Sequence, residues 1–297
     1  MVAVILKDSC ISKIAHTERN DEVGFMAKAL VADIRTALTK DQFYLKYQPQ
    51  VDNCGRVSGF EALLRWKHPL YGEVPPPVII ALAEESNMIN EIGHSVMQKA
   101  FYQLAQWRSA GAEQISLAIN VSPSQLKDKS IIKSLQLLIE KYGVDPNFIE
   151  LEFTESVEIA ATEEVIQVIE SLKGLGFKLA MDDFAMGHTS LLYLRHYSLD
   201  TIKIDGSLTV DVVKNINCQD IIATLVYLAG STGAKLIAEH VETEEQWKML
   251  IELGCSHFQG YLFYEPLAVE EAFKIISTMD NSETPSIATF YGSVNHT

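Results

Sequence analysis

The segment FIELEFTESVEIAATEEVIQVIESLKGLGFKLAMDD (148–183) predicts a strand, a helix and a second strand in succession. Its first part, FIELEFTE (148–155), is an apolar run that ends in polar residues. In TEEVIQVIESLKGLG (162–176) the apolar residues recur at helical spacing, and FKLAMDD (177–183) returns to a strand pattern that stops at two acids. Strands that alternate with helices in this way form parallel sheets.

The same alternation extends in both directions along the chain. Further strand-like runs are GFEALLRW (59–66), ISLAIN (115–120), DTIKID (200–205), AKLIAEHVE (234–242) and HFQGYLF (257–263). The helical segment TEEQWKMLIELG (243–254) opens with a capping box of Thr243 and Gln246 and ends at Gly254. About eight strand–helix units close into a barrel, so the sequence predicts a TIM-like (β/α)8 barrel of the α/β class.

The chain of 297 residues is long enough for one such domain. A barrel takes about 250 residues, and we expect it to occupy residues 26–280. Residues 1–25 are predicted to be an N-terminal extension, and residues 281–297, which have no periodicity, a mobile C-terminal tail.

The bulk composition excludes several classes of function. A net charge of −15 argues against a surface for long nucleic acid, although it does not exclude a small phosphate ligand. The four cysteines have no CxxC or zinc-type spacing and are typical of a reducing compartment. MVAVIL at the start is too short for a signal-peptide core, and no apolar run reaches the ~18 residues of a membrane span. We therefore expect a cytoplasmic protein.

Polar residues gather at the predicted strand ends. They are Asn120, Glu152, Asp182, Asp183, Lys203, Glu239 and Gln259. In (β/α)8 barrels the carboxyl ends of the strands carry the chemistry, and this clustering therefore predicts an active site there.

The doublet Asp182–Asp183 is the most informative of these positions. Successive strand residues point to opposite faces, so both can serve one site only if Asp183 already lies in the loop. Two adjacent carboxylates then suit two neighbouring divalent cations, with Asp182 between them. The alternative is a turn or a helix N-cap made by one of the two.

Other polar residues allow two interpretations each. Glu61 and Arg65 share a strand face about 13 Å apart, and serve either as metal ligand and phosphate contact or as rim residues with other partners. Asn120 offers an oxygen that suits magnesium or manganese, or forms a turn. We assign Glu152 to the metal, and expect the nearby Glu150 to be satisfied structurally.

Lys203 and the residues after the next strand complete the candidate site. Lys203 either takes part in proton transfer or forms an internal ion pair with Asp205 or a barrel carboxylate. Glu239 or Glu242 could complete a second metal site or orient a water. His188 and His240 are interpreted as loop residues, because no HxH or HExxH spacing marks a zinc site.

Seven motifs in order give the sequence a specific resemblance. They are FEALLRW, INVSPSQL, ELEFTES, MDDF, IKIDGSL, AEHVET and FQGYLFYEPL. Together they resemble the EAL-domain family of cyclic di-GMP phosphodiesterases, over residues 36–275. The resemblance implies a barrel whose first strand is antiparallel, and the turn-like VDNCGR (51–56) fits a hairpin between the first two strands.

The resemblance also implies roles for individual residues. Glu61, Asn120, Glu152 and Asp182 would hold one Mg²⁺ or Mn²⁺ ion, and Asp182, Asp183 and Glu239 would hold a second. Lys203 and Glu239 would be catalytic; Gln48, Leu64, Arg65 and Gln259 would contact substrate or water; Glu155 would anchor a loop. The implied reaction is hydrolysis of cyclic di-GMP to linear pGpG by a water that two metals activate, in a homodimer. The alternative is a receptor that binds cyclic di-GMP without cleaving it.

The sequence departs from the family pattern at two places. Where members usually have Gly-Thr-Gly-Tyr-Ser after MDDF, this chain has Ala185, Met186, Gly187, His188 and Thr189, so the coupling of this loop to metal binding and dimer contacts is in question. His240 replaces the usual Gly of the AEGVE pattern. Neither change removes a predicted ligand.

Overall fold

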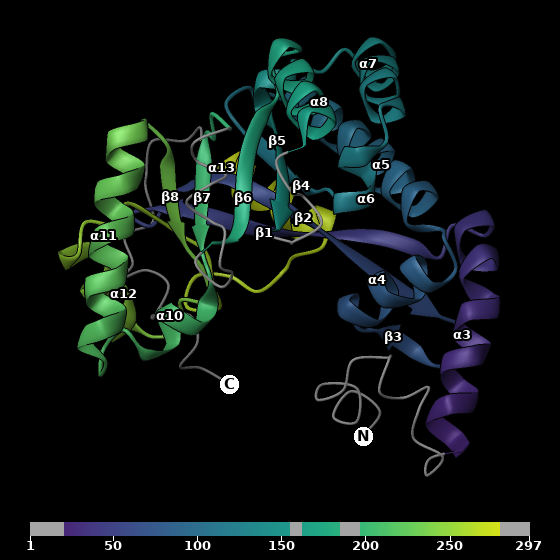
Figure 1. The fold of residues 1–297 in the computed structure, drawn as a ribbon, viewed down its shortest axis with the longest axis horizontal. Coiled ribbons are helices and arrows are strands. Elements are labelled where there is room, and N and C mark those ends of the chain that lie inside the picture. Colours follow the sequence, from purple (N-terminus) through teal and green to yellow (C-terminus); the bar gives the residue numbers. More distant parts are fainter. Residues whose placement is uncertain (1–20, 155–161, 185–196, 280–297) are drawn as a thin grey trace. The chain divides into compact units, whose positions relative to one another are not determined.

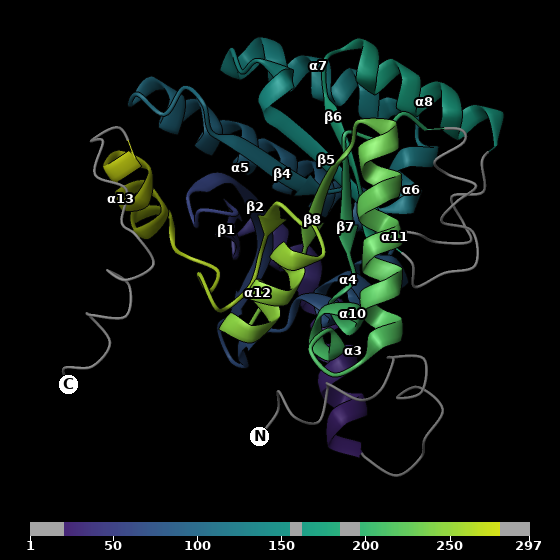
Figure 2. The same cartoon turned by 90° about the vertical axis from the view of Figure 1, so that its left-hand side faces the viewer.

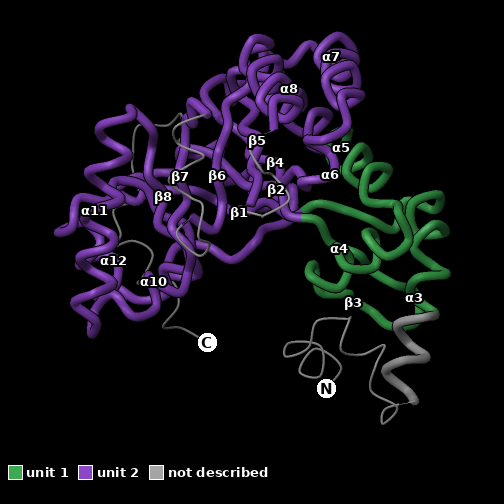
Figure 3. The backbone as a smooth tube through the Cα atoms, in the orientation of Figure 1, with its two compact units in different colours: residues 1–45, 64–99 green, residues 46–63, 100–297 purple. Residues whose placement is uncertain are grey.

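The computed structural model describes residues 21–154, 162–184 and 197–279, and of residues 21–28 and 279 it describes only the backbone. The chain divides into two compact units, which Figure 3 distinguishes by colour. Unit 1 comprises residues 1–45 and 64–99, and unit 2 comprises residues 46–63 and 100–297. The predicted domain limits at residues 25 and 280 stay predictions, and helix α3 (Asp21–Thr39) crosses the first of them.

Eight strands form a closed sheet, as the sequence predicts (Figures 1 and 2). They are β1 (Phe43–Asp52), β2 (Val57–His68), β4 (Ser116–Asn120), β5 (Ile149–Thr154), β6 (Lys178–Phe184), β7 (Thr201–Ile204), β8 (Lys235–Ala238) and β9 (His257–Phe258). Their order is β1-β9-β8-β7-β6-β5-β4-β2, and the pairing of β1 with β2 closes the ring. The neighbours from β2 to β9 run parallel, whereas β1 is antiparallel to β9. The expected TIM-like barrel with an antiparallel first strand is confirmed.

The β1–β2 hairpin is fixed by Asp52 at its turn. The Asp52 carboxylate accepts hydrogen bonds from the backbone N–H groups of Cys54 and Arg56, at 2.8 and 3.0 Å. The Arg56 guanidinium pairs with the same carboxylate at 2.8 Å. Gly55 has a φ of 78°, in the left-handed region that some turns require. Glycine adopts this conformation at no steric cost. The predicted turn at VDNCGR is therefore present.

Helices follow the strands of unit 2. They are the second part of α5 (Ile89–Ser109), α6 (Pro123–Lys127), α7 (Ser130–Tyr142), α8 (Glu163–Gly174), α10 (Gly206–Asp211), α11 (Ile216–Thr232), α12 (Glu244–Glu252) and α13 (Val269–Met279), with a 3₁₀ turn at Pro146–Phe148. The capping box of Thr243 and Gln246 begins α12, as predicted. α11 packs against β7 and β8 (Figure 2).

Unit 1 has a small core of its own. It contains α3, α4 (Pro76–Glu85), β3 (Gly72–Val74), which is antiparallel to the end of β2, and the start of α5. The buried Trp66 ring packs on Phe43, with centroids 5.3 Å apart, and its Nε1 donates to Gln42. Of the helices that the structure describes, none has both the length and the apolar character needed to cross a membrane.

Small residues on the strands leave room for the long polar side chains of the barrel. By strand alternation, Ala118 shares a face with Asn120, and Ala180 shares one with Asp182. Both alanines are almost fully buried. Glu152 and Lys203 are buried in the same unit.

Candidate active site

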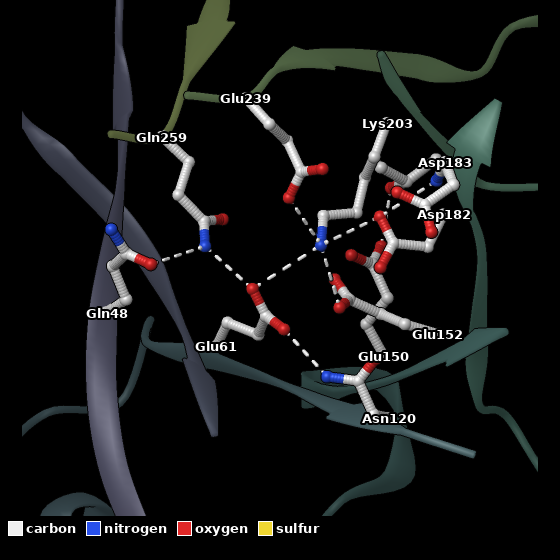
Figure 4. Close-up of polar contacts among 11 residues, drawn as sticks. Gln48, Glu61, Asn120, Glu150, Glu152, Asp182, Asp183, Lys203, Glu239 and Gln259 are labelled. Carbon is white, nitrogen blue, oxygen red and sulfur yellow. Dashed lines mark hydrogen bonds and ion pairs between the residues drawn. The ribbon is translucent and has the colours of Figure 1, made fainter. Parts of the chain in front are cut away.

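The predicted polar residues of unit 2 come together around one lysine (Figure 4). They come from the strands or from positions directly after them: Gln48 on β1, Glu61 on β2, Asn120 at the end of β4, Glu152 on β5, Asp182 and Asp183 on β6, Lys203 on β7, Glu239 after β8 and Gln259 after β9.

Lys203 lies at the centre of the cluster and is completely buried. Its Nζ is 2.9 Å from Glu152 Oε2 and 2.9 Å from Glu239 Oε1. It is 3.3 Å from Asp182 Oδ1 and 3.4 Å from Glu61 Oε2. The predicted ion pair of Lys203 with barrel carboxylates is thus present. One ammonium faces four carboxylates, so the cluster carries excess negative charge.

Burial and the neighbouring charges shift the pKa values of Lys203, Glu239 and Glu152. Burial opposes the charge of Lys203, but the carboxylates outweigh it and hold the pKa of the ammonium well above its usual value. Burial raises the pKa of Glu239 to about 8, although Lys203 counteracts part of the shift. The pKa of the Glu152 carboxyl is also raised well above its usual value, mainly by burial. These acids therefore need further positive charge to stay ionised together.

Glu61 is held by amide side chains as well as by Lys203. Asn120 Nδ2 donates to Glu61 Oε1 at 2.7 Å, and Gln259 Nε2 donates to Oε2 at 2.6 Å. Burial alone would raise the pKa of Glu61, but Lys203 and these two hydrogen bonds lower it. Gln259 Nε2 also donates to Gln48 Oε1, at 3.2 Å. Because Nδ2 of Asn120 donates to Glu61, Oδ1 of the same amide remains available as a cation ligand.

A bulge in β6 brings both aspartates to the site. The register with β7 passes from Met181–Ile202 to Phe184–Ile204, so Asp182 and Asp183 lie opposite the single Lys203. Asp183 has a φ of 53°, and its N–H donates to Asp182 Oδ1 at 3.1 Å. The expectation that Asp183 lies in a loop is wrong, because β6 continues to Phe184. A bulge re-aims a side chain without ending the strand.

Asp183 has a further carboxylate neighbour in Asp205. Burial, the charge of Asp182 and a hydrogen bond with Asp205 together raise the pKa of Asp183 to about 6. The prediction that Asp205 pairs with Lys203 finds no support among the ion pairs of the described residues. In the motif IKID, Asp205 follows β7 directly and is the N-cap of α10.

The donor set fits divalent cations. Oxygen atoms of Asp182, Asp183 and Glu239 lie within 4.8 Å of one another, the only such group among the described His, Cys, Asp and Glu residues. Glu152 Oε1 and Gln259 Oε1 are buried, and neither has a hydrogen-bond partner in the part of the chain that the structure describes. Hard oxygen ligands of this kind suit Mg²⁺ or Mn²⁺.

Two neighbouring acids have other surroundings. Glu150 accepts a hydrogen bond from the Thr201 hydroxyl, in agreement with the structural role expected for it. Glu242 is exposed, and its backbone N–H donates to Gln246 in the cap of α12. Of the two candidates after β8, Glu239 is therefore the one that reaches the cluster.

Three of the predicted residues belong to unit 1 or lie outside the described residues. Leu64 and Arg65 belong to unit 1, where Arg65 Nη1 donates to the Leu64 carbonyl at 2.8 Å. Glu155 lies outside the described residues, as does the altered loop at residues 185–189. Their predicted roles stay predictions.

Comparison with known proteins supports the resemblance seen in the sequence. The model of the EAL domain family matches residues 31–266. The cyclic di-GMP phosphodiesterase NbdA of Pseudomonas aeruginosa is 36% identical over 243 residues, which are 80% of this chain and 31% of NbdA. The cyclic di-GMP phosphodiesterase PdeR of Escherichia coli is 34% identical over 238 residues, which are 80% of this chain and 36% of PdeR. The chain thus spans about a third of the length of these relatives.

A solved structure shows the same fold. The PaMucR phosphodiesterase in complex with c-di-GMP is 33% identical and superposes with a TM-score of 0.78, covering 82% of this chain and 99% of that chain. With the barrel, the acidic cluster and the family match over residues 31–266 in agreement, this chain belongs to the EAL domain family.

Proposed function

We propose that this chain hydrolyses one phosphodiester bond of cyclic di-GMP and releases linear pGpG. The observation that carries the proposal is the buried cluster in which Lys203 is the one cation, among the described residues, that pairs with four carboxylates. Such a pocket is costly unless cations enter it, and cations beside a phosphate ester promote hydrolysis. The names of the relatives and the c-di-GMP complex of PaMucR support this choice of substrate.

Two divalent cations, Mg²⁺ or Mn²⁺, are proposed as cofactors. One would be held by Glu61, Asn120, Glu152 and Asp182, and the other by Asp182, Asp183 and Glu239. When bound, they would supply the positive charge that makes water nucleophilic at neutral pH and that neutralises the phosphoryl oxygens. The proximity of the oxygens of Asp182, Asp183 and Glu239 supports the second group.

Lys203 and Glu239 are suited to handle the proton of the attacking water. Their charged atoms are 2.9 Å apart, within hydrogen-bond distance. A carboxylate beside the attacking water can act as its general base. As the oxygen of water bonds to phosphorus and the bond to one ribose oxygen breaks, Glu239 would accept the proton of the water and the leaving ribose oxygen would take a proton from solvent to become a hydroxyl. Lys203 would stabilise the negative charge on the phosphoryl oxygens.

Substrate contacts are proposed for the amide side chains at the edge of the cluster. Gln48 donates to the Tyr264 carbonyl and accepts from Gln259, which holds both amides in place. Gln259 Oε1 is left for a ligand or water. Arg65 and Leu64 are proposed to bind the substrate, and Glu155 to anchor the neighbouring loop.

The proposal is tested by incubating the purified chain with cyclic di-GMP and either Mg²⁺ or Mn²⁺ and following pGpG by chromatography. We expect pGpG with the wild type and with Asp220→Asn, a matched change at an exposed position of α11, and none with Asp182→Asn. Tight binding of cyclic di-GMP without pGpG under either metal would establish the receptor alternative instead.

We further propose that the chain forms a homodimer and acts in the cytoplasm. Cys54, Cys218 and Cys255 are free thiols, which supports a reducing compartment. Light scattering during size-exclusion chromatography tests the dimer, and a monomer at micromolar concentration would contradict it.

A further inference from the structure

His240 follows Glu239 directly and has an unusual backbone. Its φ is 53°, in the left-handed region that favours glycine. A non-glycine residue keeps such a conformation only where its surroundings hold it, and residues of this kind concentrate at functional sites. The side chain of His240 is exposed, so burial of the ring does not account for its position.

The ring of His240 lies directly against Gly206. A Cβ added to Gly206 would be 2.3 Å from His240 Nδ1 and 2.5 Å from Cγ, too close for any side chain. Gly206 follows Asp205, the N-cap of α10, whose carboxylate accepts from the Ser207 N–H at 2.8 Å. The ring therefore rests on the turn after β7, the turn that carries the hydrogen-bond partner of Asp183.

The backbone after His240 is held from the other side. Val241 N–H donates to the Gln259 carbonyl at 3.1 Å, and Leu262 N–H donates to the Val241 carbonyl at 3.0 Å. A Cβ on Gly260 would lie 2.2 Å from the Val241 oxygen. Two glycines thus lie against the segment that follows Glu239. Gly206 lies against the ring of His240, and Gly260 lies against the backbone of Val241.

We propose that His240 is a positioning residue, whose ring on Gly206 fixes the turn after β7 against the segment after β8 and thereby sets the cation affinity of Asp182, Asp183 and Glu239. The inference rests on the proposed function, since it concerns the same cation site. Glu239 and Asp205 lie at the two ends of this contact, one residue from His240 and one from Gly206. A change of either contact partner moves a carboxylate of the site without removing one.

A double-mutant cycle tests the contact directly. The four proteins are the wild type, Gly206→Ala, His240→Gly and the double variant, with Mn²⁺ affinity measured by calorimetry and unfolding by urea in the presence of a chelator. We expect His240→Gly and Gly206→Ala each to weaken Mn²⁺ binding by about 10-fold, the range for residues that orient ligands. In the His240→Gly background, Gly206→Ala should change the affinity by less than about 2-fold, because the ring that it would strike is gone.

Gly230→Ala is the matched control for adding a methyl group. Gly230 lies in α11, and a Cβ there would have no atom within 4 Å. It should leave Mn²⁺ affinity as in the wild type. A merely structural contact would change the unfolding curve but not Mn²⁺ binding, so changes confined to unfolding would overturn the inference.

The outcomes separate this inference from the proposed function. If the four Mn²⁺ affinities follow the expected cycle but the wild type gives no pGpG, the positioning role is supported and hydrolysis is contradicted. Four proteins that hydrolyse cyclic di-GMP with equal Mn²⁺ affinities would overturn the positioning role alone. A wild type that binds no Mn²⁺ would overturn both.

Discussion

Lys203 Nζ lies 2.9 Å from Glu152 Oε2, and neither side chain is exposed to solvent. Removing two such charges from water costs several kcal/mol for each, about as much as their attraction returns. Glu152 Oε1 has no partner among the described residues, so the pair alone does not satisfy this carboxylate. The arrangement is better explained by cation binding than by the stability of the fold.

Lys203→Met should strongly destabilise the protein in a chelator. The change leaves four carboxylates around an apolar side chain, and breaking a buried ion pair in this way costs about 3–5 kcal/mol. Urea unfolding measures the loss, and Mn²⁺ should restore part of it. Lys248→Met, at an exposed position of α12 where the lysine pairs with Glu244, should cost less than about 0.5 kcal/mol. Equal losses for the two variants would contradict the central role of Lys203.

Much of the barrel could be predicted because its signals are local. Each strand is a short apolar run, and a polar residue such as Asn120 ends it, so both the fold and the side chains at the carboxyl ends of the strands follow from the sequence. The hairpin turn after β1 has the same origin, since Asp52 and Gly55 are turn residues.

The remaining features depend on contacts between distant segments. The bulge at Asp182 and Asp183 is defined by register with β7, which no pattern within β6 contains. The approach of His240 to Gly206 joins residues 34 positions apart (240 − 206), and only the folded barrel brings them together. The boundary of unit 1 is equally invisible in the sequence, because it falls within β1, β2 and α5.

Asp182→Asn should affect stability and metal binding in opposite directions. Without metal, the variant removes one of four carboxylates around Lys203, so the free energy of unfolding should stay the same or increase. Mn²⁺ affinity should fall by at least about 10-fold, the smallest effect typical of residues that only orient ligands. Unfolding in a chelator and calorimetric titration give the two values. A variant that loses stability without metal yet binds Mn²⁺ normally would disprove the assignment.

Gln259→Glu should destabilise the cluster through Glu61. The change removes the amide donor that lies 2.6 Å from Glu61 Oε2 and places a carboxylate in its position. Losing a buried hydrogen bond to a charged group costs about 1–3 kcal/mol, and the added repulsion increases this cost. Gln167→Glu, at an exposed position of α8, is the matched control and should have little effect. Similar unfolding curves for the two variants would show that the Gln259–Glu61 contact does not stabilise the site.

His257 should make the stability of the chain depend on pH between about 4 and 6.5. Burial, with a smaller effect of Lys235, lowers the pKa of His257 to about 4, whereas the unfolded chain has the ordinary value of about 6.5. In this range the unfolded state binds more protons, so the contribution is fully present above pH 6.5 and is lost as the pH falls through 4. His257→Asn should remove it, reducing the rise in the free energy of unfolding between pH 4.5 and 7.5 by about 1–2 kcal/mol after allowance for solvent screening. His257→Gln, which also lacks a titrating ring, should give the same flatter profile in urea unfolding with a chelator present. A profile as steep as that of the wild type in both variants would assign the pH dependence to other groups.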